Sequence, residues 1–98
     1  MAIYKNITTE TTTTLITKGG DVTKRVSKIL ISNNSSSDAT DITVNLYDGT
    51  NVFYLIRDVV IPSKVSLVLE DNVSFDTKKF NLRISNAGTN PNLTVIIK

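Results

Sequence analysis

The chain contains no histidine, cysteine, tryptophan or glutamine among its 98 residues, and it has only three alanines and two glutamates. Histidine is the usual general base near neutral pH, so its absence and that of cysteine remove the common nucleophile–base pairs and the Cys/His metal sites. The lack of cysteine also excludes a disulfide framework, so stability must come from packing or assembly. We therefore expect a scaffold rather than an enzyme, with no cofactor and no metal.

Long apolar runs and concentrated charge are also missing. The longest apolar run is Val52-Phe53-Tyr54-Leu55-Ile56, far below the roughly 20 residues of a membrane-spanning helix. The N-terminus Met1–Asn6 lacks the apolar core and small-residue cleavage site of a secretory signal. The net charge is only +2, and the densest basic group, Lys24, Arg25 and Lys28, would be divided between the two faces of a strand. We expect a non-exported protein that binds neither a membrane nor nucleic acid.

β-branched residues dominate what is present, since 35 of the 98 residues are Thr, Val or Ile. Such side chains pack well on a pleated surface and lose rotamer freedom in a helix. The chain is 40% hydrophobic and 20% charged, as in globular proteins, and its length suits one domain. We expect a single all-β domain over residues 1–98.

The clearest strand pattern lies in the middle of the chain, where Ile42, Val44 and Leu46 alternate with more polar residues. The Asp48-Gly49 step that follows is a strong hairpin signal. The returning strand covers residues 52–57, and residues 58–61 either extend it past a bulge or form another short strand.

Similar patterns predict further strands on both sides of this hairpin. They are a Thr-rich lead at 7–17, a central strand at 22–32, and strands at 65–70, 80–85 and 93–97. Seven or eight short strands in 98 residues predict an antiparallel two-sheet β-sandwich, either immunoglobulin-like or jelly-roll-like.

The remaining polar side chains offer weak candidate sites. Carboxylate pairs such as Asp38 with Asp41, or Glu70-Asp71 with Asp76, lie in polar loops where nothing would shift a pKa, so we interpret them as solvated turn residues. The segments 48–51 and 70–72 hold oxygen ligands of the kind that Ca²⁺ prefers, without the spacing of an EF-hand.

Two groups of apolar and aromatic residues are candidate contact sites. Tyr47 and Tyr54 flank the expected hairpin and could together stack a sugar or a base, or contact another protein, although tyrosine in a sandwich more often buries its ring. Ile3, Tyr4 and Ile7 have no evident place in the sandwich. We expect residues 1–10 to form an extended N-terminal arm that adds a strand to a neighbouring subunit or docks on a partner.

The order of the segments resembles a known family. The strand at 25–33 is followed by a Ser-rich loop, then by Ile42-Thr43-Val44-Asn45-Leu46, by an Ile61-Pro62 step and by Ser66-Leu67-Val68-Leu69. This succession is similar to the small β-sandwich virion proteins of tailed bacteriophages. The resemblance implies a non-enzymatic, many-copy component of the particle, either a capsid decoration protein or a tail or baseplate accessory. It further implies a homo-oligomer that binds other virion proteins and resides in the virion after synthesis in the host cytoplasm.

Two other function classes stay open. A carbohydrate-binding module for host surface recognition would need Tyr47, Tyr54 or Phe53 exposed in a groove. A single-strand nucleic-acid binder would need Lys24, Arg25 and Lys28 beside exposed aromatic residues.

Overall fold

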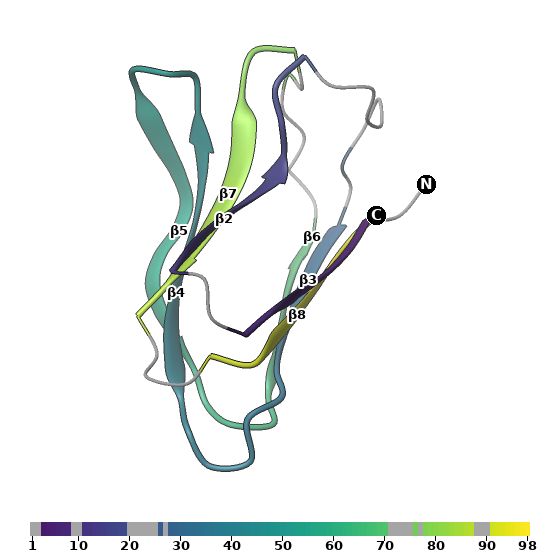
Figure 1. Ribbon diagram of the computed structural model, residues 1–98, viewed down its shortest axis with the longest axis vertical. Helices are drawn as coiled ribbons and strands as arrows, with labels where there is room; N and C mark the ends of the chain where they lie inside the picture. The colour runs from purple at the N-terminus through teal and green to yellow at the C-terminus, as the bar shows by residue number, and fades with distance from the viewer. Residues whose placement is uncertain are drawn as a thin grey trace.

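Two antiparallel four-stranded sheets pack face to face in the computed structural model (Figure 1). The structure describes residues 3–8, 11–19, 26, 28–70, 76, 78–87 and 91–98. These residues form eight strands and no helix, as the sequence predicts. The strands are β1 (Ile3–Ile7), β2 (Thr12–Ile16), β3 (Lys28–Asn33), β4 (Thr40–Tyr47), β5 (Val52–Ile61), β6 (Ser66–Glu70), β7 (Asn81–Asn86) and β8 (Leu93–Ile97).

The strand order distinguishes between the two expected kinds of sandwich. One sheet has the order β1-β8-β3-β6 and the other has the order β2-β7-β4-β5. Strands therefore pair as nested partners, β1 with β8, β2 with β7, β3 with β6 and β4 with β5. Nested pairing of eight strands over two sheets is the jelly-roll arrangement, and it differs from the strand order of an immunoglobulin domain.

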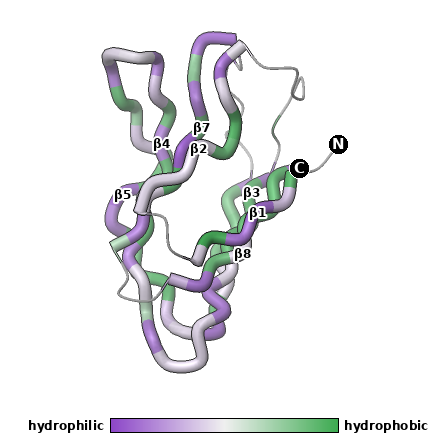
Figure 2. The backbone as a smooth tube through the Cα atoms, in the orientation of Figure 1, coloured by the Kyte–Doolittle hydropathy of each residue, from purple (hydrophilic) through white to green (hydrophobic). Residues whose placement is uncertain are grey.

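Alternation along the strands builds an aliphatic core between the sheets. In β4, Ile42, Val44 and Leu46 point inward as the sequence predicts, and buried and less buried residues also alternate along β3, β7 and β8. The colours in Figure 2 show hydrophobic and hydrophilic residues interspersed along the chain. The buried hydrophobic residues are Ile7, Ile16, Val26, Ile29, Ile31, Ile42, Val44, Leu46, Ile61, Leu82, Ile84, Leu93, Val95 and Ile97. None of the aromatic residues in the described ranges belongs to this set, although the partly buried Phe80 packs against it.

The N-terminal segment has a place in the sandwich, and the expectation that it lacks one is wrong. Residues 3–7 form β1, an edge strand antiparallel to β8 of the same chain, with Ile3 opposite Ile97 and Ile7 opposite Leu93. Ile7 is fully buried. The Thr-rich lead is likewise not one element, because Ile7 ends β1 and the threonines belong to β2. Residues 1, 2, 9 and 10 of the expected arm lie outside the described residues.

The predicted central strand is confirmed in its position between β8 and β6. Its described part begins at Lys28, and the earlier part of the predicted range, apart from Val26, lies outside the described residues. The strand is central because both of its edges are hydrogen-bonded, while the side chain of Leu30 is only half-buried.

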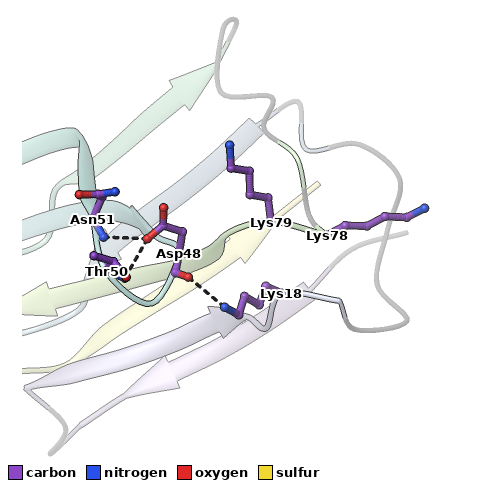
Figure 3. Close-up of a pocket in the computed structure, with 6 residues that line it drawn as sticks. All are labelled: Lys18, Asp48, Thr50, Asn51, Lys78 and Lys79. Atoms are coloured by element: carbon purple, nitrogen blue, oxygen red, sulfur yellow. Dashed lines mark hydrogen bonds between the residues drawn. The ribbon is translucent and has the colours of Figure 1, made fainter.

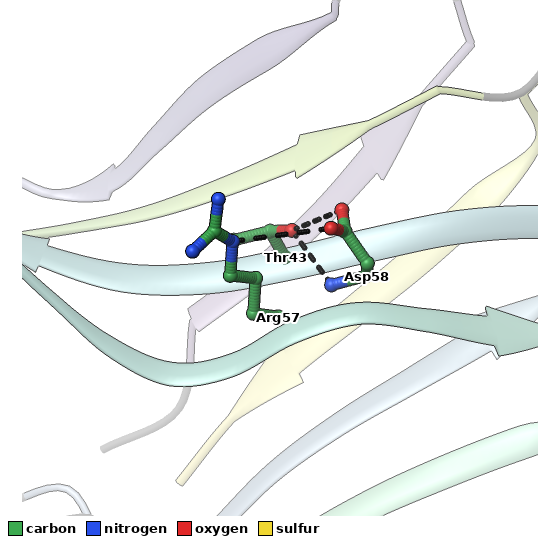
Figure 4. Close-up of polar contacts among 3 residues, drawn as sticks. All are labelled: Thr43, Arg57 and Asp58. Atoms are coloured by element: carbon green, nitrogen blue, oxygen red, sulfur yellow. Dashed lines mark hydrogen bonds and ion pairs between the residues drawn. The ribbon is translucent and has the colours of Figure 1, made fainter.

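β5 continues through residues 58–61, so the first of the two sequence-based alternatives holds. Its pairing with β4 shifts twice, each time leaving one extra residue in β5. At one shift Asp58 adopts a left-handed backbone with φ of 52°, which Asp tolerates better than most residues. The Asp58 N–H donates to Thr43 Oγ1 at 3.0 Å, and Arg57 Nε lies 3.9 Å from Asp58 Oδ2 (Figure 4). These contacts hold a β-bulge at the edge of the sheet.

Candidate interaction surface

The outer face of the β2-β7-β4-β5 sheet brings together residues from three strands. Asn45 of β4 lies between Tyr54 of β5 and Arg83 of β7 in the register. Tyr47 lies two residues after Asn45 on β4 and is paired with Val52 of β5. Tyr47 and Tyr54 are therefore diagonal neighbours on one face of the sheet. We call the set Asn45, Tyr47, Tyr54, Arg57 and Arg83 the tyrosine–arginine face.

Arg83 fixes one half of this face. Its Nε donates to Asn45 Oδ1 at 3.0 Å, and its guanidinium carbon lies 4.1 Å from the centre of the Tyr47 ring. The Tyr47 hydroxyl donates to the Gly49 carbonyl at 2.9 Å. Asn45 is only 4% exposed although it points away from the core, because these side chains cover it. One side of the Tyr47 ring is therefore already occupied by a cation–π contact.

Tyr54 forms the more accessible half. Its side chain is 50% exposed, and the guanidinium carbon of Arg57 lies 4.8 Å from its ring centre. The structure thus brings the two predicted tyrosines onto one face, each with an arginine against its ring. Tyrosine and arginine are the residue types most enriched among the energetically important contacts of protein interfaces. This composition suits a protein partner better than a two-ring sugar platform.

Exposed hydrophobic side chains gather on the same edge strand. Within the described ranges, the large exposed hydrophobic residues are Tyr4, Val52, Phe53, Tyr54, Val60, Val65 and Val68. Four of these seven lie on β5. Val52 and Tyr54 point to the outer face, Phe53 points to the opposite side and contacts the Phe80 ring, and Val60, which is 56% exposed, lies beyond the register shifts. Exposed apolar surface on an edge strand is a usual contact site. The two register shifts break the regular hydrogen-bonding edge, so side-chain docking fits β5 better than strand addition.

The predicted N-terminal contact residues differ in accessibility. Tyr4 is 69% exposed, Ile3 is half-buried, and Ile7 is fully buried. Ile7 therefore holds β1 on the core and is not accessible to a partner. Tyr4 lies at the β1 edge of the molecule and remains a candidate contact.

Among the described residues, no group of three or more carboxylates is placed so that it could hold a metal ion. In the segment proposed for calcium, Asp48 Oδ1 accepts hydrogen bonds from the Thr50 and Asn51 N–H groups at 2.8 and 2.7 Å. These two bonds, mainly that from Asn51, lower the pKa of Asp48. The Asp48 carbonyl accepts a bond from Lys18 Nζ. Asp48 therefore acts as a cap of the hairpin, while residues 71 and 72 of the second calcium candidate lie outside the described part.

A basic hollow beside the hairpin is the feature that sequence reasoning missed. It has a volume of about 640 Å³ and is lined by Lys18, Asp48, Thr50, Asn51, Lys78 and Lys79 (Figure 3). The adjacent pair Lys78-Lys79 is visible in the sequence, but Lys18 joins it only through the fold. Of the three basic residues that the sequence singled out, Lys28 lies on β3 with its Nζ 3.7 Å from Glu70 Oε2, and Lys24 and Arg25 lie outside the described ranges.

Comparison with family models, with curated proteins and with solved structures gave no match. No helix long and apolar enough to cross a membrane occurs in the portion of the chain that the structure describes.

Proposed function

We propose that the protein is a non-enzymatic structural component of a bacteriophage particle, either a capsid decoration protein or a tail or baseplate accessory, and that it acts through protein–protein contacts. The observation that carries the proposal is the concentration of exposed apolar and aromatic side chains on β5, beside the tyrosine–arginine face. A face of this kind is costly to leave in water unless a partner covers it.

The jelly-roll arrangement supports this proposal by analogy, because that fold is frequent in viral capsid proteins as well as in lectins. The order of sequence segments, which resembles that of phage virion proteins, points the same way. The lack of histidine and cysteine favours a role in assembly over catalysis.

A stable interface buries about 800 Å² on each partner, which is about one seventh of the chain's accessible surface of 5745 Å². The candidate surface extends along the ten residues of β5 at one sheet edge, and the tyrosine–arginine face beside it draws on three strands.

Immunogold electron microscopy tests membership in a particle. Antibodies raised against the chain are applied to gradient-purified particles released from the cells that carry its gene. We expect label at repeated positions on heads or tails. Unlabelled particles, with all of the protein in the soluble fraction, would overturn the proposal.

A carbohydrate-binding module is the second candidate, and the half-exposed ring of Tyr54 is the observation that favours it. A glycan array distinguishes the two functions when the wild type is compared with Tyr54→Ala. Binding to a defined glycan that Tyr54→Ala abolishes would establish the module. An array without hits removes this candidate and leaves the particle protein.

A further inference from the structure

The basic hollow beside the β4–β5 hairpin joins parts of the chain that are distant in sequence. Lys18 follows β2, Lys78 and Lys79 precede β7, and Asp48, Thr50 and Asn51 form the hairpin loop. Figure 3 shows the Lys18 side chain directed at the hairpin and the Lys79 side chain rising on the same side as the Asp48 carboxylate. Lys78 extends away from the hairpin in that view, so it contributes from the rim.

Two hydrogen bonds hold Lys18 in place. Its backbone N–H donates to Asn81 Oδ1 at 2.7 Å, and its Nζ donates to the Asp48 carbonyl at 2.9 Å. Gly49, next to Asp48 in the turn, has a positive φ of 106°, which favours glycine, while an added Cβ would make only an ordinary contact with Lys18 Nζ at 3.5 Å. An ammonium group has three donors. The Asp48 carbonyl takes one of them, and the others remain for a ligand.

The positive charge of the hollow is not balanced by ion pairs. Within the described ranges the ion pairs are those of Lys28 with Glu70 and of Arg57 with Asp58, and neither lines the hollow. The lining thus holds three lysines and one carboxylate, that of Asp48, whose Oδ1 is occupied by the hairpin amides. Outside the lining, the Asp76 carboxylate accepts a hydrogen bond from the Lys78 N–H at 2.9 Å. Lys79 Nζ also lies 5.5 Å from the centre of the Phe80 ring. This cation–π contact holds the ammonium group against the protein.

We propose that this hollow is a binding site for phosphate-class oxyanions. Lys18 and Lys79 contact the anion, the Thr50 hydroxyl offers a further donor, and Lys78 adds charge from the rim. Lysine ammonium groups are common phosphate ligands that act as point charges. Because these groups are exposed and hydrated, one phosphate binds weakly, whereas several linked phosphates engage all three lysines together. This inference does not depend on the proposed virion role.

Calorimetric titration of the full chain with orthophosphate and with tripolyphosphate tests the proposal. We expect saturable binding of tripolyphosphate, at least about tenfold tighter than that of orthophosphate, and weakening as salt is raised. Lys18→Gln and Lys79→Gln should each weaken it at least about fivefold, and Lys78→Gln should weaken it less. Gln keeps a donor for the Asp48 carbonyl, and thermal melts verify that each variant folds.

Lys5→Gln is the matched control, because it removes the same charge from β1, a strand of the other sheet. It should change the affinity by less than about twofold. If tripolyphosphate binds more tightly, the ligand of this site is a molecule with several linked phosphates. If orthophosphate binds with equal affinity per site, the ligand is a free anion. The proposal is overturned if no saturable binding occurs up to about 10 mM of either probe, or if Lys5→Gln weakens binding as much as Lys18→Gln does.

Discussion

Asn33, at the end of β3, connects two segments that the sheets alone would leave apart. Its side-chain Nδ2 donates to the carbonyls of Asp38 and Ile61, both at 2.9 Å, and its Oδ1 accepts from the Ser35 N–H at 3.1 Å. The residue is buried, and its bond to the Ile61 carbonyl is buried with it, while the bonds to Asp38 and Ser35 are partly buried. The Ser-rich loop and the end of β5 are thereby fixed to the same side chain, a role that nothing in the local sequence indicates.

Asn33→Ala should lower the free energy of unfolding by about 2–3 kcal/mol, because it leaves the buried Ile61 carbonyl and the partly buried Asp38 carbonyl without their donor. Asn34→Ala is the neighbouring control. The Asn34 amide bonds Thr94 Oγ1 at the surface, so its removal should cost less than about 1 kcal/mol. Urea denaturation measures the free energy of unfolding of both variants. Equal losses of stability in the two variants would contradict the role given to Asn33.

Thr40 is a buried residue whose side-chain hydroxyl lowers the stability of the fold. It is 4% exposed, and its Oγ1 has no hydrogen-bond partner. Thr40→Val keeps the shape and removes the buried hydroxyl, so it should raise the free energy of unfolding by about 1 kcal/mol. Thr14→Val, at an exposed position of β2, should change it by less than about 0.5 kcal/mol. A destabilised Thr40→Val variant in the same urea titration would refute this interpretation.

At the scale of elements, local patterns were readable from the sequence and distant pairings were not. The alternation in β4 and the Asp48-Gly49 turn lie within one stretch of chain, and both predictions are confirmed. β1 pairs with β8 at the other end of the chain, so no local pattern around Ile3 and Ile7 reveals it. The same reason hid the basic hollow, since Lys18 and Lys79 meet only when β2 and β7 pair.

The β4–β5 hairpin should show an acid-sensitive stability. The lowered pKa of Asp48 means that its ionised carboxylate stabilises the folded state. This contribution is complete above the unfolded pKa, about 3.9, and is lost as the pH falls through the lower folded pKa. Urea titrations of the wild type and Asp48→Asn at several pH values measure it. The stability advantage of the wild type should be constant near neutrality and shrink below about pH 4. If the difference in the free energy of unfolding between the wild type and Asp48→Asn does not vary with pH, the stabilising role given to the Asp48 carboxylate is contradicted.

At the scale of the whole molecule, an aliphatic core closes the sandwich, and three aromatic side chains of the described residues, Tyr4, Phe53 and Tyr54, are exposed outside it. β5 carries much of this exposed apolar surface, and the tyrosine–arginine face adjoins it. The basic hollow lies at the hairpin end of the same pair of strands. The molecule therefore separates a buried interior from an edge suited to contacts, which is the arrangement that the proposed role in a particle would use.

The solution mass, measured by multi-angle light scattering at several concentrations, tests the central claim that β5 makes protein–protein contacts. We expect a discrete multiple of the 10.8 kDa chain. Val60→Lys should shift it toward the monomer, because a charge replaces an exposed apolar contact on β5. Thr14→Lys, which adds the same charge to β2 of the same sheet, should leave the mass unchanged. A wild type that stays monomeric at every concentration, or an oligomer that Val60→Lys does not affect, would contradict the account.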